Sequence, residues 1–208
     1  SLVAPGDFLP LAERIGLGPD VDRWVIARAL GVVAGLSADA PVAITVNLSG
    51  GSLNDPAFLR WLSATLRGHT VPRGRLVIEV TEADAITSPG RIDRLADDLR
   101  ARRCELSLDG FGAQFGSLHQ VKELPCDYLK IHRGYIQALA TSRTDQVMVQ
   151  ALVDVCRAVG MRTVAEFVGD EETLRLVAEL GVDHAQGFHV GRPSPLAEID
   201  VLCPSPGR

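Results

Sequence analysis

The sequence has little that marks a secreted or membrane-spanning chain. Its four cysteines are widely spaced, form no CxxC pair and fall mostly in apolar segments, at Cys104, Cys126, Cys156 and Cys203. We therefore expect free thiols in a reducing compartment. There is no basic-then-apolar signal segment at the N-terminus, and no apolar run approaches the roughly 20 residues of a membrane span. We expect a cytoplasmic location without membrane contact from this chain, although a parent protein can be membrane-anchored.

Long runs of like charge are also absent. The chain has 21 Lys and Arg against 26 Asp and Glu, a net charge of -5, which argues against general nucleic-acid binding. With 208 residues and 46% hydrophobic content, the chain is long enough to bury one sizeable core. We expect one domain over residues 1–197, incomplete at its N-terminal side, followed by a tail over residues 198–208.

Helical and strand patterns alternate along the chain, which is typical of a parallel sheet wrapped by helices. Apolar stripes with helical spacing predict helices over 21–36, 56–66, 91–101, 146–159 and 172–180. Short apolar runs predict strands over 42–46, 76–80, 105–109, 128–131, 163–167 and 183–187. Gly160 and Gly181 stand where C-terminal helix caps belong.

Six parallel strands are compatible with an open doubly wound sheet or with part of a β/α barrel. No Gly-rich phosphate loop follows any strand, so the dinucleotide-binding version of the open sheet has little support. A barrel needs eight strands. We therefore predict an α/β, TIM-like (β/α) barrel whose first two strands lie upstream of this sequence.

Each predicted strand ends in or near a polar residue. In chain order these residues are Asn47, Glu79, Asp109, Lys130, Glu166 and Gln186. Barrel enzymes carry their chemistry at the carboxyl ends of the strands, and buried charges are unfavourable unless they are paired or bound to metal. Six polar strand ends converging on one mouth therefore indicate a functional site.

Three carboxylates and an amide oxygen are hard ligands that suit Mg²⁺ or Mn²⁺. A lysine beside them would hold an anionic oxygen or orient a metal-bound water, which favours phosphodiester chemistry. A glycosidase is the competing interpretation, because barrels often place two carboxylates across a sugar. It explains Glu79 and Glu166 but leaves Asn47, Asp109 and Lys130 without roles.

Several segments resemble the motifs of the EAL domains, a family that hydrolyses or binds the bacterial second messenger cyclic di-GMP. PGDFLPLAERIG is similar to P-x-x-F-I-P-L-A-E, VIEVTEAD to the E-I-T-E strand, and LSLDGFGAQFGSL to the D-D-F-G-T-G-Y-S-S-L loop. The later motifs of the family also resemble segments of this chain, in the same order: LPCDYLKIHRGYI, TVAEFVGDEETL and AQGFHVGRP. TVNLS is similar to the strand that carries the metal-ligand Asn. The resemblance extends over nearly the whole chain.

The resemblance implies a role for each matching residue. Asn47, Glu79 and Asp109 would be metal ligands, Lys130 would sit beside the attacking water, and Glu166 would be a metal-linked acid or general base. Glu82 would brace the loop after Asp109. The nucleotide-binding rim would contain Gln186, Arg192 and Pro193. It also implies Mg²⁺ or Mn²⁺ as cofactor, cyclic di-GMP as ligand, a homodimer through the loop after Asp109, and a sensory or cyclase-like domain upstream.

The chain departs from the family pattern at three acidic positions. The second Asp of the D-D pair is Gly110, the Asp after Lys-Ile is His132, and the second Glu of A-E-G-V-E is Gly169. The Gly of the last motif is Phe167. A carboxylate that would hold a second metal is therefore missing, and we expect no full two-metal site. We expect His132 to make an ordinary hydrogen bond rather than to bind metal.

Three functions remain open at this stage. The leading hypothesis is a degenerate, cyclic di-GMP-binding regulatory module with weak or no hydrolysis. The alternatives are an active metal-dependent phosphodiesterase and a protein-interaction scaffold that no longer binds nucleotide. Among the aromatic residues, we expect Trp24, Trp61 and Phe111 in the core, with Phe111 and Phe115 as candidates for the dimer contact.

Overall fold

The computed structural model describes residues 5–36, 42–113 and 121–195. Its helices are α1 (Pro5–Arg14), α2 (Gly18–Gly35), α3 (Gly50–Asn54), α4 (Pro56–Arg67), α5 (Glu82–Thr87), α6 (Pro89–Arg100), α8 (Arg133–Ile136), α9 (Arg143–Val159) and α10 (Glu171–Glu179). Its strands are β1 (Ile44–Asn47), β2 (Leu76–Thr81), β3 (Glu105–Phe111), β4 (Tyr128–Ile131), β5 (Arg162–Ala165) and β6 (His184–Ala185).

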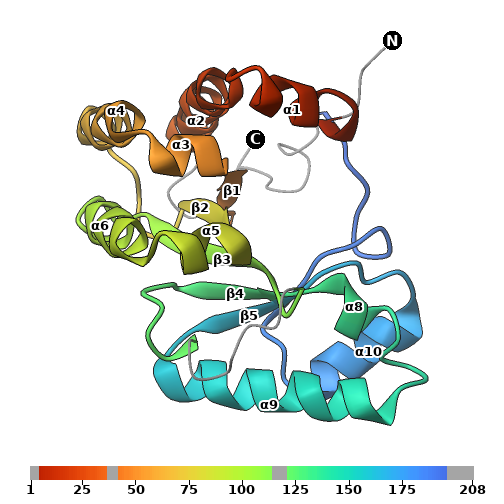
Figure 1. The fold of residues 1–208 in the computed structure, drawn as a ribbon. Helices are drawn as coiled ribbons and strands as arrows, with labels where there is room; N and C mark the ends of the chain where they lie inside the picture. The colour runs from red at the N-terminus through yellow and green to blue at the C-terminus, as the bar shows by residue number, and fades with distance from the viewer. Residues whose placement is uncertain (1–4, 37–41, 114–120, 196–208) are drawn as a thin grey trace, which may run out of the picture.

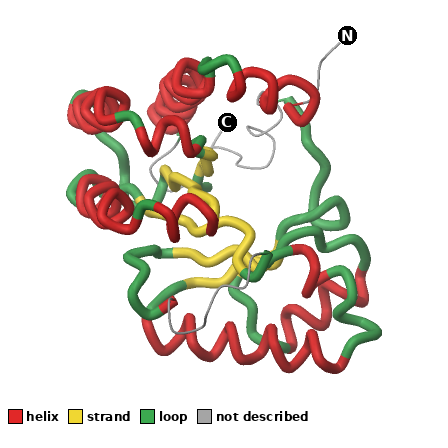
Figure 2. Tube along the Cα trace, in the orientation of Figure 1, coloured by secondary structure: helices red, strands yellow, loops and turns green. Residues whose placement is uncertain are grey.

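The strands of the described residues form one parallel sheet in the order β1-β2-β3-β4-β5-β6. Helices α2, α4, α6 and α9 follow one another around the outside of this curved layer (Figures 1 and 2). Each strand therefore pairs with the next strand in the sequence, as in a β/α barrel. The predicted fold class is confirmed, whereas the two further strands remain a prediction.

The side chains of each strand alternate between the helices and the inner face of the sheet. Val46, Ile78 and Leu106 belong to the buried core that the helices cover. The inner face carries polar groups, among them the buried side chains of Ser107 and Lys130, and it lines a cavity of about 280 Å³. Polar residues on that face point toward the place where a barrel axis would run.

Helices α2, α4, α6, α9 and α10 agree with the predicted ranges within a few residues, but α1 and three short helices that follow strands were not predicted. Ser49 caps α3, Thr81 caps α5 and His132 caps α8, each by accepting a hydrogen bond from a backbone N–H in the first turn. Four to six residues are too few for an apolar stripe of helical period, which explains why the pattern missed them.

The core predictions for the two tryptophans had different outcomes. Trp61 is partly buried and packs against the core, next to Phe58 at 5.4 Å between ring centroids. The prediction that Trp24 lies in the core was wrong, because Trp24 is 70% exposed on α2. Helix α2 buries Asp22 and Ile26 instead, so the face that it turns to the core excludes Trp24.

Asp22 is buried because it ties α2 to the loop after β1. Its carboxylate accepts hydrogen bonds from the backbone N–H of Ser49 at 2.9 Å and from the Ser49 hydroxyl at 2.7 Å. Ser49 in turn caps α3. One buried carboxylate therefore fixes the chain that leaves β1 directly after Asn47.

The prediction of free thiols is confirmed for Cys104, Cys126 and Cys156, which are buried, whereas the reducing compartment remains a prediction. Cys203 and the predicted boundary at residues 197 and 198 lie outside the described residues. None of the helices in the described ranges has the length and hydropathy that crossing a membrane requires.

Replacing Asp22 by Ala should destabilise the protein by about 1–3 kcal/mol, because two donors of Ser49 lose a buried acceptor. Urea denaturation of Asp22→Ala and of Asp20→Ala measures the difference. Among the described residues, the Asp20 side chain forms an exposed ion pair with Arg23, so its variant should change the free energy of unfolding by less than about 1 kcal/mol. Equal effects of the two substitutions would contradict this account of α2.

Candidate functional site

The strand register brings the polar strand ends to one edge of the sheet. Asn47 is paired with Glu79 across β1 and β2, and Asp109 with Thr81 across β2 and β3. Lys130 is in the middle of β4, opposite Val164. Strand β5 ends at Ala165, two residues earlier than predicted, so Glu166 is the first residue after the strand.

Lys130 is the centre of the site. Its Nζ atom lies 3.2 Å from Glu79 Oε2, 3.0 Å from Asp109 Oδ1 and 3.0 Å from Glu166 Oε1. The Lys130 and Glu79 side chains are each 6% exposed, and the Glu166 side chain is 13% exposed. One buried ammonium thus joins three strands, and four of the six predicted strand-end residues form a single cluster.

The charges in this cluster shift one another's ionisation. Burial raises the pKa of Glu79, although Lys130 opposes this shift. Burial also raises the pKa of Glu166 against the effect of the same lysine. Burial alone would lower the pKa of Lys130, but Glu79, Asp109 and Glu166 together raise it above its ordinary value. Three carboxylates against one ammonium leave the cluster with an excess of negative charge when all four are ionised.

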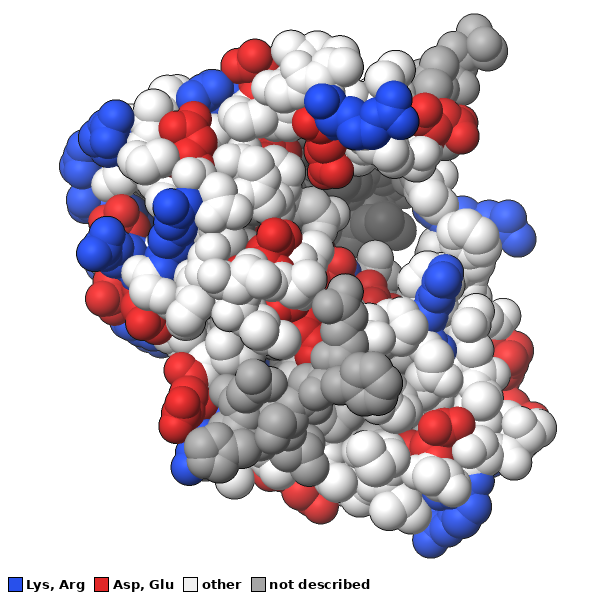
Figure 3. All heavy atoms as spheres, viewed as in Figure 1, with Lys and Arg blue, Asp and Glu red and all other residues white. Residues whose placement is uncertain are grey.

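Asn47 lines a larger cavity beside this cluster. The cavity measures about 630 Å³ and is bordered by Asn47, Glu79, Thr81 and Asp84 together with residues of α1 and α2. In Figure 3, acidic side chains lie in the middle of the face as well as at its edges, whereas Lys and Arg lie mostly at the edges. The structure therefore brings Asn47 to the same mouth as Glu79, on the side away from Glu166.

The loop after Asp109 is attached to α5. Glu82 is buried, and its carboxylate accepts a hydrogen bond from the backbone N–H of Gly112 at 3.1 Å. Gly110 has a φ of +69°, and a Cβ atom added there would meet nothing within 4 Å. Space is thus open at the position where the family resemblance predicts a second Asp, and its left-handed backbone is one that Asp and Asn tolerate best among side-chain-bearing residues.

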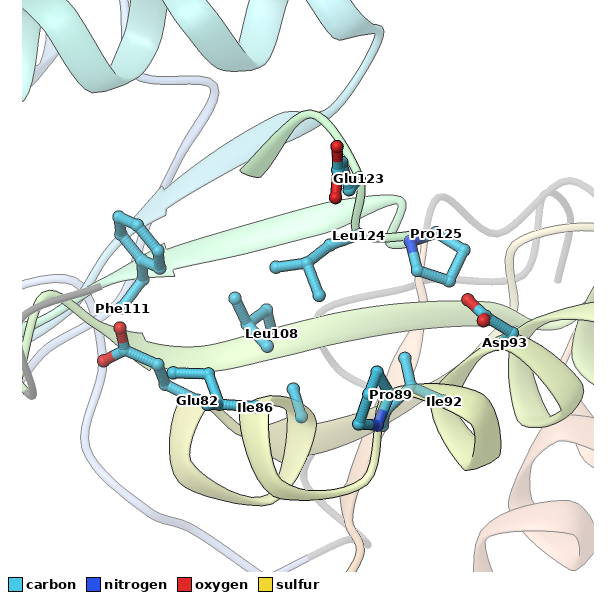
Figure 4. A pocket seen from close by; sticks show the side chains of 11 residues that line it. Glu82, Ile86, Pro89, Ile92, Asp93, Leu108, Phe111, Glu123, Leu124 and Pro125 are labelled. Atoms are coloured by element: carbon cyan, nitrogen blue, oxygen red, sulfur yellow. The ribbon is translucent and has the colours of Figure 1, made fainter. Parts of the chain in front are cut away.

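A second cavity, of about 310 Å³, lies between α5, α6 and β3. Leu108 and Leu124 face each other across it, with Glu82 and Phe111 at one end (Figure 4). Phe111 is 3% exposed, which confirms its placement in the core. Phe115, the other candidate for a dimer contact, lies outside the described residues.

The structure also describes His132 and Gly169, the two other positions that differ from the family motifs, and the predicted rim residues. Nδ1 of His132 accepts a hydrogen bond from the backbone N–H of Gly134 at 3.2 Å, so this histidine acts as a helix cap. Gly169 is exposed after β5 and presents no side chain. Arg192 and Pro193 are exposed beyond β6. Gln186 borders the cavity on the inner face of the sheet.

The side-chain oxygens of Asn47, Glu79 and Asp109 are of the type that binds a hard divalent cation. Their arrangement in the structure agrees with such a site only in part. Asp109 Oδ1 is buried, and the Lys130 ammonium, 3.0 Å away, occupies the place beside it that a metal cation would take. In the same residues, no group of three His, Cys, Asp or Glu side chains is arranged around a point for a metal ion. The Lys130 ammonium lies among the carboxylates instead. The donor set therefore has the right chemistry for one cation, but Lys130 would have to move aside.

Two contributors to the site were not predicted from the sequence. Thr81 and Asp84 line the cavity beside Asn47, and the Thr81 hydroxyl donates a hydrogen bond to Asp84 Oδ2 at 2.6 Å. Their spacing, T-E-A-D directly after an apolar strand, is a helix-capping pattern that is visible in the sequence. That pattern would have predicted α5 and placed both residues at the mouth.

Comparison with known proteins identifies relatives over almost the entire chain. A family model described as "EAL domain" matches residues 1–193. The "Cyclic di-GMP phosphodiesterase PdeB" of Shewanella oneidensis is 35% identical over 199 residues, which cover 94% of this chain and 23% of that protein. The chain spans about a quarter of the length of the curated relatives that it matches.

Solved structures of similar proteins have the same fold. The structure "PaMucR Phosphodiesterase, c-di-GMP complex" has a TM-score of 0.84 and 33% identity, and the match covers 96% of this chain and 81% of that one. The FimX EAL domain of Pseudomonas aeruginosa bound to c-di-GMP has a TM-score of 0.82 and 27% identity, over 92% of this chain and 77% of that one.

Replacing Lys130 by Met should destabilise the protein by about 3–5 kcal/mol near pH 8, because three carboxylates lose their shared cation. The loss should shrink as pH falls toward 5. Carboxyl groups with a raised pKa bind more protons in the folded than in the unfolded state, so the stability that they confer increases as pH falls.

Urea denaturation at several pH values measures this dependence. The matched control is Lys122→Met, since Lys122 is exposed and is the only other lysine in the sequence. A loss of stability in Lys130→Met that is the same at pH 5 and pH 8 would contradict the assignment.

Proposed function

The chain belongs to the EAL-domain family, and we propose that it is a regulatory module that binds cyclic di-GMP at the strand-end mouth and hydrolyses it weakly or not at all. The observation that carries this proposal is the arrangement at β3 and β4. The Lys130 ammonium is held among three carboxylates, and Gly110 stands where the family has a second metal-binding Asp.

The residues that line the mouth support the proposal that cyclic di-GMP still binds there. Gln186, Arg192 and Pro193 keep the residue types of the nucleotide-binding rim, and Asn47 and Glu79 border a cavity of about 630 Å³. Two structures similar to this chain are complexes with c-di-GMP. These rim residues are separate from the missing acidic positions 110, 132 and 169, so their contacts to a nucleotide do not depend on the lost carboxylates.

Loss of turnover follows from the missing acidic groups. Gly110 and Gly169 supply no carboxylate, and the imidazole of His132 caps α8. Each well-placed group that stabilises the transition state contributes on the order of 10²-fold to the rate. Two or three such losses reduce hydrolysis much more than they reduce affinity.

A divalent metal is the implied cofactor. Mg²⁺ or Mn²⁺ would supply Lewis-acid polarisation of the phosphodiester when bound. Asn47, Glu79 and Asp109 would hold one such ion. For a second ion the chain lacks the carboxylate at Gly110. We therefore propose at most partial metal occupancy, with Lys130 contacting the anionic ligand.

An active phosphodiesterase is the second candidate function, and one observation favours it. The pKa of Glu166 is raised by burial, which moves this carboxyl toward the range in which a general acid or base works. Related proteins are named cyclic di-GMP phosphodiesterases. This function requires that Glu79, Asp109, Glu166 and a further upstream ligand suffice.

Two partner assignments accompany the proposal. We propose a homodimer through the loop after Asp109 and a sensory or cyclase-like domain upstream, as the family resemblance implies. A protein-interaction scaffold without nucleotide binding is the remaining alternative. The glycosidase alternative leaves Lys130 without a role, so we do not retain it.

Isothermal titration calorimetry with cyclic di-GMP, with and without Mg²⁺ or Mn²⁺, tests the proposal together with chromatography of the products. We expect binding in both conditions and little or no linear dinucleotide. Metal-dependent product that disappears in Glu79→Ala would identify an active phosphodiesterase. An absence of binding in every condition would identify the scaffold.

Restoring a carboxylate should raise any hydrolysis. In Gly110→Asp the new side chain enters open space, and its negative charge adds the missing ligand, so we expect a metal-dependent rate at least tenfold above that of the parent chain. Gly110→Ala is the matched control, because it imposes a similar backbone penalty at φ +69° without the charge. Equal rates for the two variants, measured by product chromatography, would contradict the assignment of Gly110 as the lost metal position.

A further inference from the structure

Phe167 is held in a conformation that bulky residues rarely adopt. Its φ is +56°, in the left-handed region that costs a side-chain-bearing residue about 1–2 kcal/mol. The residue is 51% exposed, so core packing does not account for the placement. Its neighbour Glu166 contacts Lys130 at the centre of the site.

The surrounding loops fix this conformation. The backbone N–H of Val168 donates to the carbonyl of Gln186 at 3.0 Å, and the N–H of His189 donates to the carbonyl of Val168 at 3.2 Å. Gly187 is so close to Val168 that an added Cβ atom would collide with its backbone. The segment after β5 is therefore attached to the segment after β6, and Phe167 is held rigidly at the mouth.

A cavity of about 420 Å³ lies where these two segments meet. Its lining includes Gln137, Glu166, Phe167, Gln186 and Phe188. Phe188 is 67% exposed. Two exposed aromatic rings and several polar groups thus surround one cavity, directly beside the carboxylate cluster.

Each aromatic ring also has a guanidinium group next to it. Arg133 Cζ lies 5.4 Å from the ring centroid of Phe167, and Arg192 Cζ lies 5.2 Å from that of Phe188. An aromatic face beside a cation supplies the two interactions that a nucleotide needs, namely stacking for a planar base and charge for a phosphate.

We propose that Phe167 is a base-stacking residue and that Arg133 beside it contacts the anionic part of the same ligand. The inference rests on the proposed function for the identity of the ligand, a cyclic purine dinucleotide. The strained backbone places a ring in the mouth where the family motif has glycine. The exposed ring is therefore a binding feature that a glycine at this position would not supply.

Calorimetric titration with cyclic di-GMP of the unmodified chain, Phe167→Gly, Phe167→Leu and Phe167→Trp tests the inference. Stacking of a base on an aromatic ring changes affinity by roughly 5- to 100-fold, so Phe167→Gly and Phe167→Leu should bind at least fivefold more weakly. Phe167→Trp should bind within about twofold of the parent or more tightly. The matched control is Trp24→Leu, which removes an exposed ring on α2 and should leave affinity unchanged.

Urea denaturation of the same variants separates a binding role from a structural one. Phe167→Gly relieves the backbone strain, so it should be at least as stable as the parent while binding more weakly. If the parent binds cyclic di-GMP and Phe167→Gly binds it with the same affinity, the stacking role is wrong and the proposed function stands. Absence of binding by the parent would overturn both.

Discussion

The contacts of one buried ammonium determine the structure of the mouth. Lys130 Nζ lies within 3.2 Å of carboxylates that come from β2, from β3 and from the end of β5. Burying these carboxylates is unfavourable without a cation, which is why the pKa of Glu79 and of Glu166 is raised even beside the lysine. The lysine offsets part of this desolvation and keeps three strand ends together. The rest of the mouth is built around that cluster.

The same cluster explains how binding and hydrolysis can separate. Lys130 attracts the negative charge of a ligand phosphate, whereas it repels a metal cation. With a full set of acidic residues, excess negative charge would favour cations. Gly110, His132 and Gly169 reduce that excess, which weakens the attraction for a second cation and lessens the repulsion of an anionic ligand. The departures from the family pattern all lie near the carboxyl ends of β3, β4 and β5, where their effects combine.

Much of the fold and the position of the site follow from local sequence patterns. The buried parallel strands are short apolar runs, and the polar residue at the end of each run marks the mouth, as with Glu79 and Asp109. Tertiary contacts determine the rest. Trp24 fits an apolar helical stripe, yet α2 turns Asp22 to the core, because Ser49 donates to it from a segment 27 residues away. The left-handed backbone of Phe167 depends on pairing with the segment after β6. No local pattern contains that information.

The central claim is that the Lys130 ammonium is stabilised by three carboxylates, and NMR of the lysine side-chain nitrogens tests it most directly. The sequence has only two lysines, so the Lys130 signal is assigned by its loss in Lys130→Met. We predict that Lys130 remains protonated above the pH at which an ordinary lysine, with a pKa of 10.5, has lost its proton. We also predict that the signal moves when cyclic di-GMP is added. Deprotonation at or below the ordinary lysine pKa would contradict the claim.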